Sequence, residues 1–190
     1  KIYLTIKILT KMKKMFISKG LFLTLVAMFN TALNYAQADK LKRASPPETA
    51  TGMVGNATIT INYSSPAVKG RKIWGGLVPY DIVWRAGANE ATIFETSKDI
   101  KVDGKTLPAG KYSLYALPGE KEWAFIFNSK TGQWGIKNDG STTEEPANDV
   151  LRVNARPMKS SEFHERMRFV IDKRGFALEW ENLRVPVYIK

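Results

Sequence analysis

Residues that could do chemistry are concentrated between Gly70 and Glu95. This stretch places tryptophans and a tyrosine among arginines, an asparagine and a glutamate, and several glycines and a proline interrupt it. Aromatic rings beside charged hydrogen-bonding groups, in a segment with backbone breakers, are typical of a surface site. Trp134, flanked by glycines in a polar loop, is a further candidate for exposure. The predicted ligand-binding residues are Arg71, Trp74, Tyr80, Trp84, Arg85, Asn89, Glu90 and Trp134.

Two interpretations of this cluster remain open from the sequence. In the first, the tryptophans are stacking surfaces, the arginines clamp an anion or hydroxyl, and Asn89 and Glu90 supply hydrogen-bonding ends. In the second, the cluster is a structural corner in which Arg85 pairs with Glu90 and the tryptophans fill the edge of the core.

No metal site, cofactor or catalytic residue is assigned from the sequence. His164 is the only histidine and cysteine is absent, whereas zinc sites need several such ligands. Phosphate-cradling glycine motifs are also missing. A serine triad would require His164, but no G-x-S-x-G elbow occurs, so we expect a surface histidine. The enzymatic alternative is a carboxylate-dependent hydrolase that uses Asp81 and Glu90 on an envelope glycan.

Alternation of apolar and polar residues predicts the elements that position these residues. Ala57–Ser64 reads as a strand that follows the Gly55-Asn56 turn, and Ile100–Leu107 reads as a hairpin around Asp103-Gly104. Further alternating segments are Lys111–Leu117, Trp123–Asn128, Leu151–Arg156 and Val185–Ile189. Ser129–Asn148 has no such alternation and is predicted to be a long loop.

The segments on either side of Gly175 predict a C-terminal hairpin. A tight turn there places Arg168 opposite or diagonal to Glu179 and Arg166 likewise to Glu181, so we expect these arginines on a solvated sheet face. One helical turn is predicted for Ser160–Glu165. About ten short strands with little helical periodicity indicate an all-β fold, an antiparallel, jelly-roll-like β-sandwich.

Residues 1–38 have the parts of a secretory signal: a lysine-rich start, an apolar run over Gly20–Leu33, and small residues at Ala36 and Ala38. Because the chain opens on Lys1, a natural start at Met12 after a miscalled extension is one interpretation. We expect a flexible lead-in over 39–47, a single domain over 48–190, and no transmembrane segment after signal cleavage. The expected location is the periplasm or the exterior.

Without its first 38 residues, the chain keeps 23 basic and 18 acidic residues, so its net charge falls from +11 to +5. This mild and dispersed excess argues against nucleic acid as a partner. An exported chain without cysteine must derive its stability from a packed core.

From Ser45 to Lys190 the chain resembles a family of bacterial exported proteins known as domain of unknown function 2911. The motifs that carry the resemblance are SPP at Ser45–Pro47, ITINYSSPAVKGRKIWGGLVPYDIVWRAGANEATIFE at Ile59–Glu95, LPAGKYSL at Leu107–Leu114, PGEKEWAFIFN at Pro118–Asn128, QWG at Gln133–Gly135 and VLRV at Val150–Val153. The resemblance implies an exported, β-rich, envelope-associated protein without a settled activity, and His164 lies outside these motifs.

These observations favour a non-catalytic module that binds a small molecule or a glycan. The hydrolase described above is one alternative. A structural protein that binds an envelope protein partner is the other.

Overall fold

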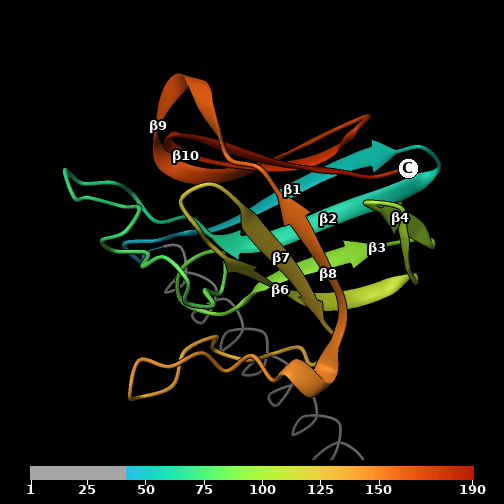
Figure 1. Ribbon diagram of the computed structural model, residues 1–190, viewed down its shortest axis with the longest axis horizontal. Helices are drawn as coiled ribbons and strands as arrows, with labels where there is room; N and C mark the ends of the chain where they lie inside the picture. The colour runs from blue at the N-terminus through green and yellow to red at the C-terminus, as the bar shows by residue number, and fades with distance from the viewer. Residues whose placement is uncertain (1–41) are drawn as a thin grey trace, which may run out of the picture. The chain divides into compact units, whose positions relative to one another are not determined.

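Ten antiparallel strands form two packed layers in residues 42–190, the part of the chain that the computed structural model describes (Figure 1). The predicted signal, residues 1–38, lies outside the described residues. The all-β, sandwich-like architecture confirms the predicted fold class. The described residues contain no helix with the length and apolar character needed to cross a membrane.

The larger layer is a six-stranded sheet whose strands follow the order β1-β2-β3-β6-β7-β8. Its strands are β1 (Pro47–Val54), β2 (Ala57–Ser64), β3 (Thr92–Thr96), β6 (Gly110–Leu117), β7 (Trp123–Asn128) and β8 (Asp149–Ala155). The one helical element of the described residues is a short 3-10 turn, Pro146–Asn148. The predicted strands over residues 57–64 and 123–128 have the observed bounds.

The second layer is the long hairpin of β9 (Met158–Asp172) and β10 (Gly175–Tyr188), and a small hairpin joins β4 (Ile100–Val102) to β5 (Lys105–Leu107). The end of β10 returns beside its beginning, where the Ile189 amide donates to the Arg174 carbonyl over 2.8 Å. It then reaches β4, because Lys101 and Lys190 exchange two backbone hydrogen bonds.

The core lies between the two layers and is filled by the inward residues of alternating strands. Phe176 of β10 packs against Phe94 of β3 and Phe125 of β7, with ring centroids 5.6 and 5.5 Å apart. At the β1 side, Tyr63 meets Phe169 edge-on at 5.0 Å. These fully or almost fully buried rings provide the apolar burial that a cysteine-free chain needs.

One local prediction for the C-terminal hairpin is wrong. Ser160–Glu165 belongs to β9 and forms no helical turn. Arg168 faces Glu179, as predicted. Glu181 pairs with His164, because the register shifts on both sides of Glu181, and Arg166, two residues further along β9, is therefore its diagonal neighbour. Glu181 has a φ of 55°, so the strand bends there and the two-residue rhythm no longer predicts the register.

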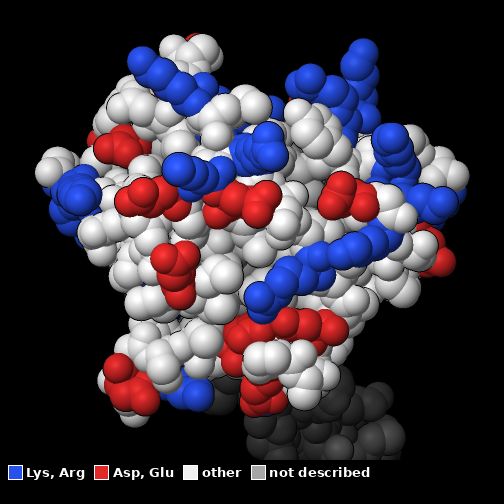
Figure 2. All heavy atoms as spheres, viewed as in Figure 1, with Lys and Arg blue, Asp and Glu red and all other residues white. Residues whose placement is uncertain are grey.

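Acidic and basic side chains are interspersed over the face shown in Figure 2. Lys111 of β6 and Glu95 of β3, 3.2 Å apart, form one cross-strand pair of opposite charge. No large field of a single sign covers that face.

Candidate functional site

The long connection between β2 and β3, residues 65–91, is attached to both layers of the sandwich. At its start, Val68 donates to the Glu165 carbonyl of β9, and Met167 donates back to Pro66. At its end, Trp84 and Ala116 of β6 exchange hydrogen bonds of 2.7 and 2.8 Å. The connection is therefore held at one end of the sandwich by main-chain bonds, which explains how an irregular segment can position side chains reproducibly.

Four residues of this connection have left-handed backbone conformations that glycine usually adopts. They are Lys69, Asp81, Ala86 and Asn89, with φ values of 47°, 60°, 50° and 56°. Ala86 is the most unusual because it is fully buried and has no polar side chain to compensate. Its carbonyl accepts a hydrogen bond from the Thr92 hydroxyl over 2.9 Å. Strain of this kind, roughly 1–3 kcal/mol per residue, persists where surrounding contacts impose it and concentrates at functional sites.

Four indole rings meet where the connection packs on the strands, and two of them belong to the connection itself. We call them the tryptophan cluster: Trp74, Trp84, Trp123 and Trp180. Trp84 and Trp180 are stacked, with centroids 6.2 Å apart and planes at 19°. Trp74 packs edge-on against both and against Trp123. Trp84 is further oriented by its Nε1–H, which donates to the Gly87 carbonyl over 3.0 Å. The cluster forms a rigid aromatic floor.

A pocket of about 460 Å³ opens over this floor. Its apolar wall comes mainly from Leu77, Val78, Pro79, Ile82, Val83 and Ile136. Three of these side chains, Leu77, Ile82 and Ile136, are 45%, 53% and 37% exposed and form an apolar rim. The volume lies in the range of small-molecule sites, about 300–1,000 Å³.

The loop between β7 and β8 supplies the other wall. Gly135, Ile136, Gly140 and Thr142 line the pocket. The loop is held down by Tyr115, whose hydroxyl lies 2.7 Å from Gln133 Oε1 and 3.1 Å from Thr143 Oγ1. The predicted loop therefore has a fixed position in the described structure.

Arg85 is the central polar residue of the pocket. Its Nε and Nη1 atoms are buried and have no hydrogen-bond partner, and burial lowers the pKa of its guanidinium, while the negative charge of Glu90 acts in the opposite direction. Its aliphatic stem lies against Gly135, where an added Cβ would be 2.6 Å from Arg85 Cβ. The glycine of the QWG motif thus leaves the space that the arginine occupies.

The structure brings three of the eight predicted residues, Arg71, Trp84 and Arg85, to the pocket lining. Arg71 is exposed, and its guanidinium donates to the carbonyls of Ala67 and Val68. Its position is therefore set by the main chain, and its charge remains at the edge of the pocket.

The other five predicted residues do not line the pocket. Trp74 supports the floor, Tyr80 packs on Gly75, and the Asn89 amide donates to the Ser45 carbonyl over 2.9 Å. Glu90 acts on Arg85 through its charge. Trp134 is 49% exposed and lies next to Gly135 in sequence. The structure therefore combines a pocket with elements of the structural corner.

Sequence reasoning missed Trp180 and the apolar rim. Trp180 alternates with other apolar residues in a strand, which indicates only a core residue, yet it belongs to the pocket lining, and its buried Nε1 has no hydrogen-bond partner. Leu77, Ile82 and Ile136 carried one usable signal, since each is a large apolar residue in a segment without strand periodicity.

The carboxylates proposed for a hydrolase do not share the pocket. Asp81 lines a separate, smaller hollow of about 240 Å³ with Glu122 and Arg152, and Glu90 lines neither hollow. Among the described residues, no group of three or more His, Asp or Glu side chains could hold a metal ion.

His164 is not the surface histidine expected from the sequence. Its side chain is only 9% exposed and its Nε2 lies 3.5 Å from the Glu179 carboxylate and 3.1 Å from the Ser160 hydroxyl. Both contacts use the same nitrogen, whereas a catalytic triad requires the acid on the opposite one. The Ser160 hydroxyl also accepts a hydrogen bond from the Glu162 amide, so the contacts of Ser160 and His164 are structural contacts within the C-terminal hairpin.

The buried carboxyl group of Glu144, close to Asp149, should make stability depend on pH. Burial, followed by the charge and hydrogen bond of Asp149, raises the pKa of Glu144 from 4.5 to about 7, and Arg152 partly opposes this. The folded protein then binds the proton more tightly than the unfolded chain. The unfolding free energy should fall as pH rises from about 4.5 to about 7, by up to about 3 kcal/mol.

Urea unfolding at pH 5 and pH 8 measures this difference. Glu144→Gln should remove most of it, whereas Glu145→Gln should keep it, because Glu145 is exposed and paired with Lys130 at 2.6 Å. A fall of equal size in all three proteins would assign the pH dependence to other groups.

Comparison with known proteins places the chain in a family without assigning it an activity. No curated protein and no solved structure matches it. A family model described as "Protein of unknown function (DUF2911)" matches residues 45–189, which include both layers and every residue of the pocket. Because this match covers most of the sequence, the chain belongs to the DUF2911 family.

Proposed function

We propose that this domain binds a small, largely apolar ligand in the pocket above the tryptophan cluster. The observation that carries the proposal is the combination of a concave, indole-floored pocket of about 460 Å³ with an exposed apolar rim. Water in contact with such surfaces is replaced favourably by a ligand of matching shape.

The rigidity of the site supports the same function. The left-handed backbone at Ala86, the stacked indoles and the main-chain attachment at both ends fix the pocket before a ligand arrives. A preformed site loses less conformational entropy on binding, so more of the contact energy appears as affinity.

The proposal is tested by isothermal titration calorimetry with 2-naphthoate, a flat probe small enough for the pocket. Ile82→Ser should weaken binding about three- to tenfold, because this rim side chain is 53% exposed and loses apolar contact with the probe. Its exposure also means that the fold should tolerate the change.

Val150→Ser is the matched control. Val150 is 43% exposed on β8 and lies outside the pocket lining, so its replacement should leave the affinity unchanged. Absence of measurable binding, or an equal loss in both variants, would contradict the proposed function.

A further inference from the structure

The hydrogen-bonding groups on the pocket wall are unequal in kind. Among the described residues that line the pocket, none is Asp, Glu, Asn or Gln. The polar side chains are two arginines, the hydroxyls of Ser45 and Thr142, and the indoles of Trp84 and Trp180. Arginine and tryptophan donate hydrogen bonds and accept none. The pocket therefore has a surplus of donors.

Several of these donors lack an acceptor. Arg85 Nε, Arg85 Nη1 and Trp180 Nε1 are buried and have no hydrogen-bond partner. Trp180 is a fully buried residue, and Arg85 carries a positive charge. Trp84 is different, since its Nε1–H is already bonded to Gly87. More than nine in ten buried polar groups have a partner, and a missing partner costs most for a charged group. The unpartnered donors on the wall are those of Arg85 and Trp180.

The side chains of the pocket wall also carry a net positive charge. Arg71 and Arg85 both line the pocket, and no carboxylate among the described lining residues offsets them. Main-chain carbonyls hold the Arg71 guanidinium at the edge of the pocket, where it contributes a positive charge. Burial lowers the pKa of Arg85, and the negative charge of Glu90, which lies outside the lining, opposes this shift.

We propose that the ligand of this pocket is an oxyanion on an apolar body, a carboxylate or a phosphate monoester of an aromatic or aliphatic group. This inference rests on the proposed function. The anionic head lies by Arg85, whose guanidinium donates to it, and the apolar body lies on the indole floor and the aliphatic rim. A neutral sugar fits less well, because each of its hydroxyls also brings a donor that needs an acceptor.

The anion is tested with two probes of nearly equal shape, 2-naphthoate and its neutral isostere 2-naphthamide. In the unaltered protein, calorimetry should find the carboxylate bound about 10- to 100-fold more tightly, as charge-assisted hydrogen bonds predict. Its affinity should fall with added NaCl, while that of the amide should not. Titration of 2-naphthyl phosphate then shows whether a carboxylate or a phosphate is the preferred head group.

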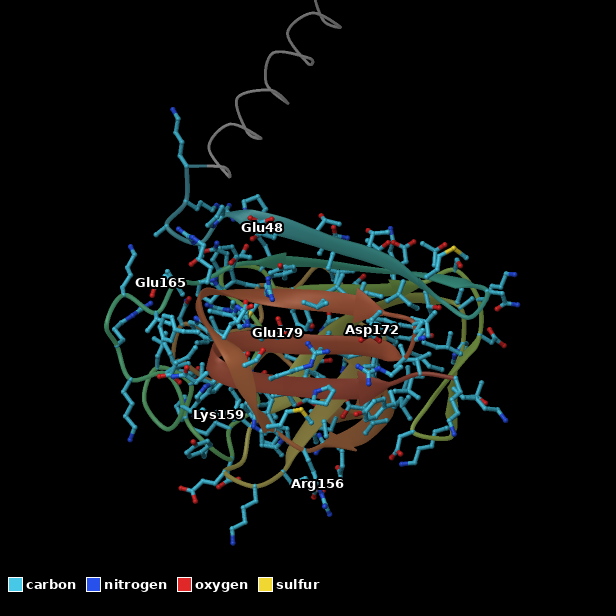
Figure 3. The ribbon with its side chains drawn as sticks, turned by 90° about the horizontal axis from the view of Figure 1, so that it is seen from above. Glu48, Arg156, Lys159, Glu165, Asp172 and Glu179 are labelled. Carbon is cyan, nitrogen blue, oxygen red and sulfur yellow. The ribbon has the colours of Figure 1, made fainter. Side chains whose placement is uncertain are left out.

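Arg85→Met keeps an unbranched apolar stem against Gly135 and removes the guanidinium. It should reduce the naphthoate-to-naphthamide ratio to about 1 and leave binding of the amide nearly unchanged. Arg156→Met is the matched control, because it removes the same charge from an exposed position outside the pocket lining, labelled in Figure 3, and should keep the ratio.

The outcomes separate the two proposals. Equal affinity for both probes in the unaltered protein would overturn the anion while the binding pocket stands. No binding of either probe would overturn the proposed function itself. The comparison of probes needs no variant, so it remains decisive if Arg85→Met fails to fold.

Discussion

Replacing Gly175 with alanine should destabilise the protein by at least about 4 kcal/mol, a loss large enough to prevent folding of many domains. Gly175 begins β10 and has a φ of 143°. A Cβ added there would lie 2.1 Å from the Val187 carbonyl oxygen and 3.0 Å from the Ile189 amide nitrogen. Both obstacles are main chain, so relief requires the end of β10 to move away from its beginning, where it supports the second layer.

Gly104→Ala is the matched control for this prediction. Gly104 also has a positive φ, 77°, but no atom lies within 4 Å of the added Cβ. Its replacement should cost only the backbone strain, about 1 kcal/mol. Chemical denaturation of both variants gives the two losses. Losses of similar size would show that backbone strain, and not the contact with Val187, determines the effect.

Glu179→Ala should cost about 2–4 kcal/mol, which corresponds to a melting temperature roughly 5–15 °C lower. Figure 3 looks onto the outer face of the β9–β10 layer, where Glu179 lies near the middle. The side chain is only 6% exposed, and its carboxylate accepts from Arg168 Nε over 2.7 Å and from Arg184 Nη1. Without it, Arg168 loses its anion and Arg184 keeps only Asp172, 3.8 Å away. Arg168 is half exposed and regains water, so the cost stays below that of a fully buried ion pair.

Glu95→Ala provides the comparison, since Glu95 pairs with Lys111 at 3.2 Å and both side chains are more than 40% exposed. Loss of this surface pair should cost less than about 1 kcal/mol. Differential scanning calorimetry of both variants measures the contrast. A small effect at Glu179 would mean that the two arginines are fully stabilised by water.

The Arg168–Glu179 pair shows both the reach and the limit of sequence patterns. Alternation around the turn predicted that these residues face one another, and they do. It also predicted a solvated face for Arg166 and Arg168, and both are exposed. It did not predict that Glu179 is buried, because the strand bends at Glu181 and brings Arg184 over the carboxylate. A two-residue period shows on which face of the sheet a side chain lies. It does not show which other side chains a later bend of the same strand brings into contact with it.

The lining of the pocket was also predicted only in part from the sequence. Residue types in an irregular segment were enough to select Arg71, Trp84 and Arg85, because arginines and indoles between breakers are typical of a site. Trp180 lies 95 positions beyond Arg85 and alternates like any core residue, so only the packing of the two layers reveals that it shares the pocket. The donors of Arg85 and Trp180 are a property of that packing and have no counterpart in a local pattern.

The stacking of Trp84 on Trp180 has a consequence for spectroscopy. Two indoles at 6.2 Å with planes 19° apart are close enough for their electronic transitions to couple, so the pair contributes an exciton band to the circular dichroism of the folded protein. Since both rings also line the pocket, whatever occupies it changes the surroundings of this chromophore pair. The aromatic floor therefore acts as an intrinsic optical reporter of occupancy, and no dye has to be attached.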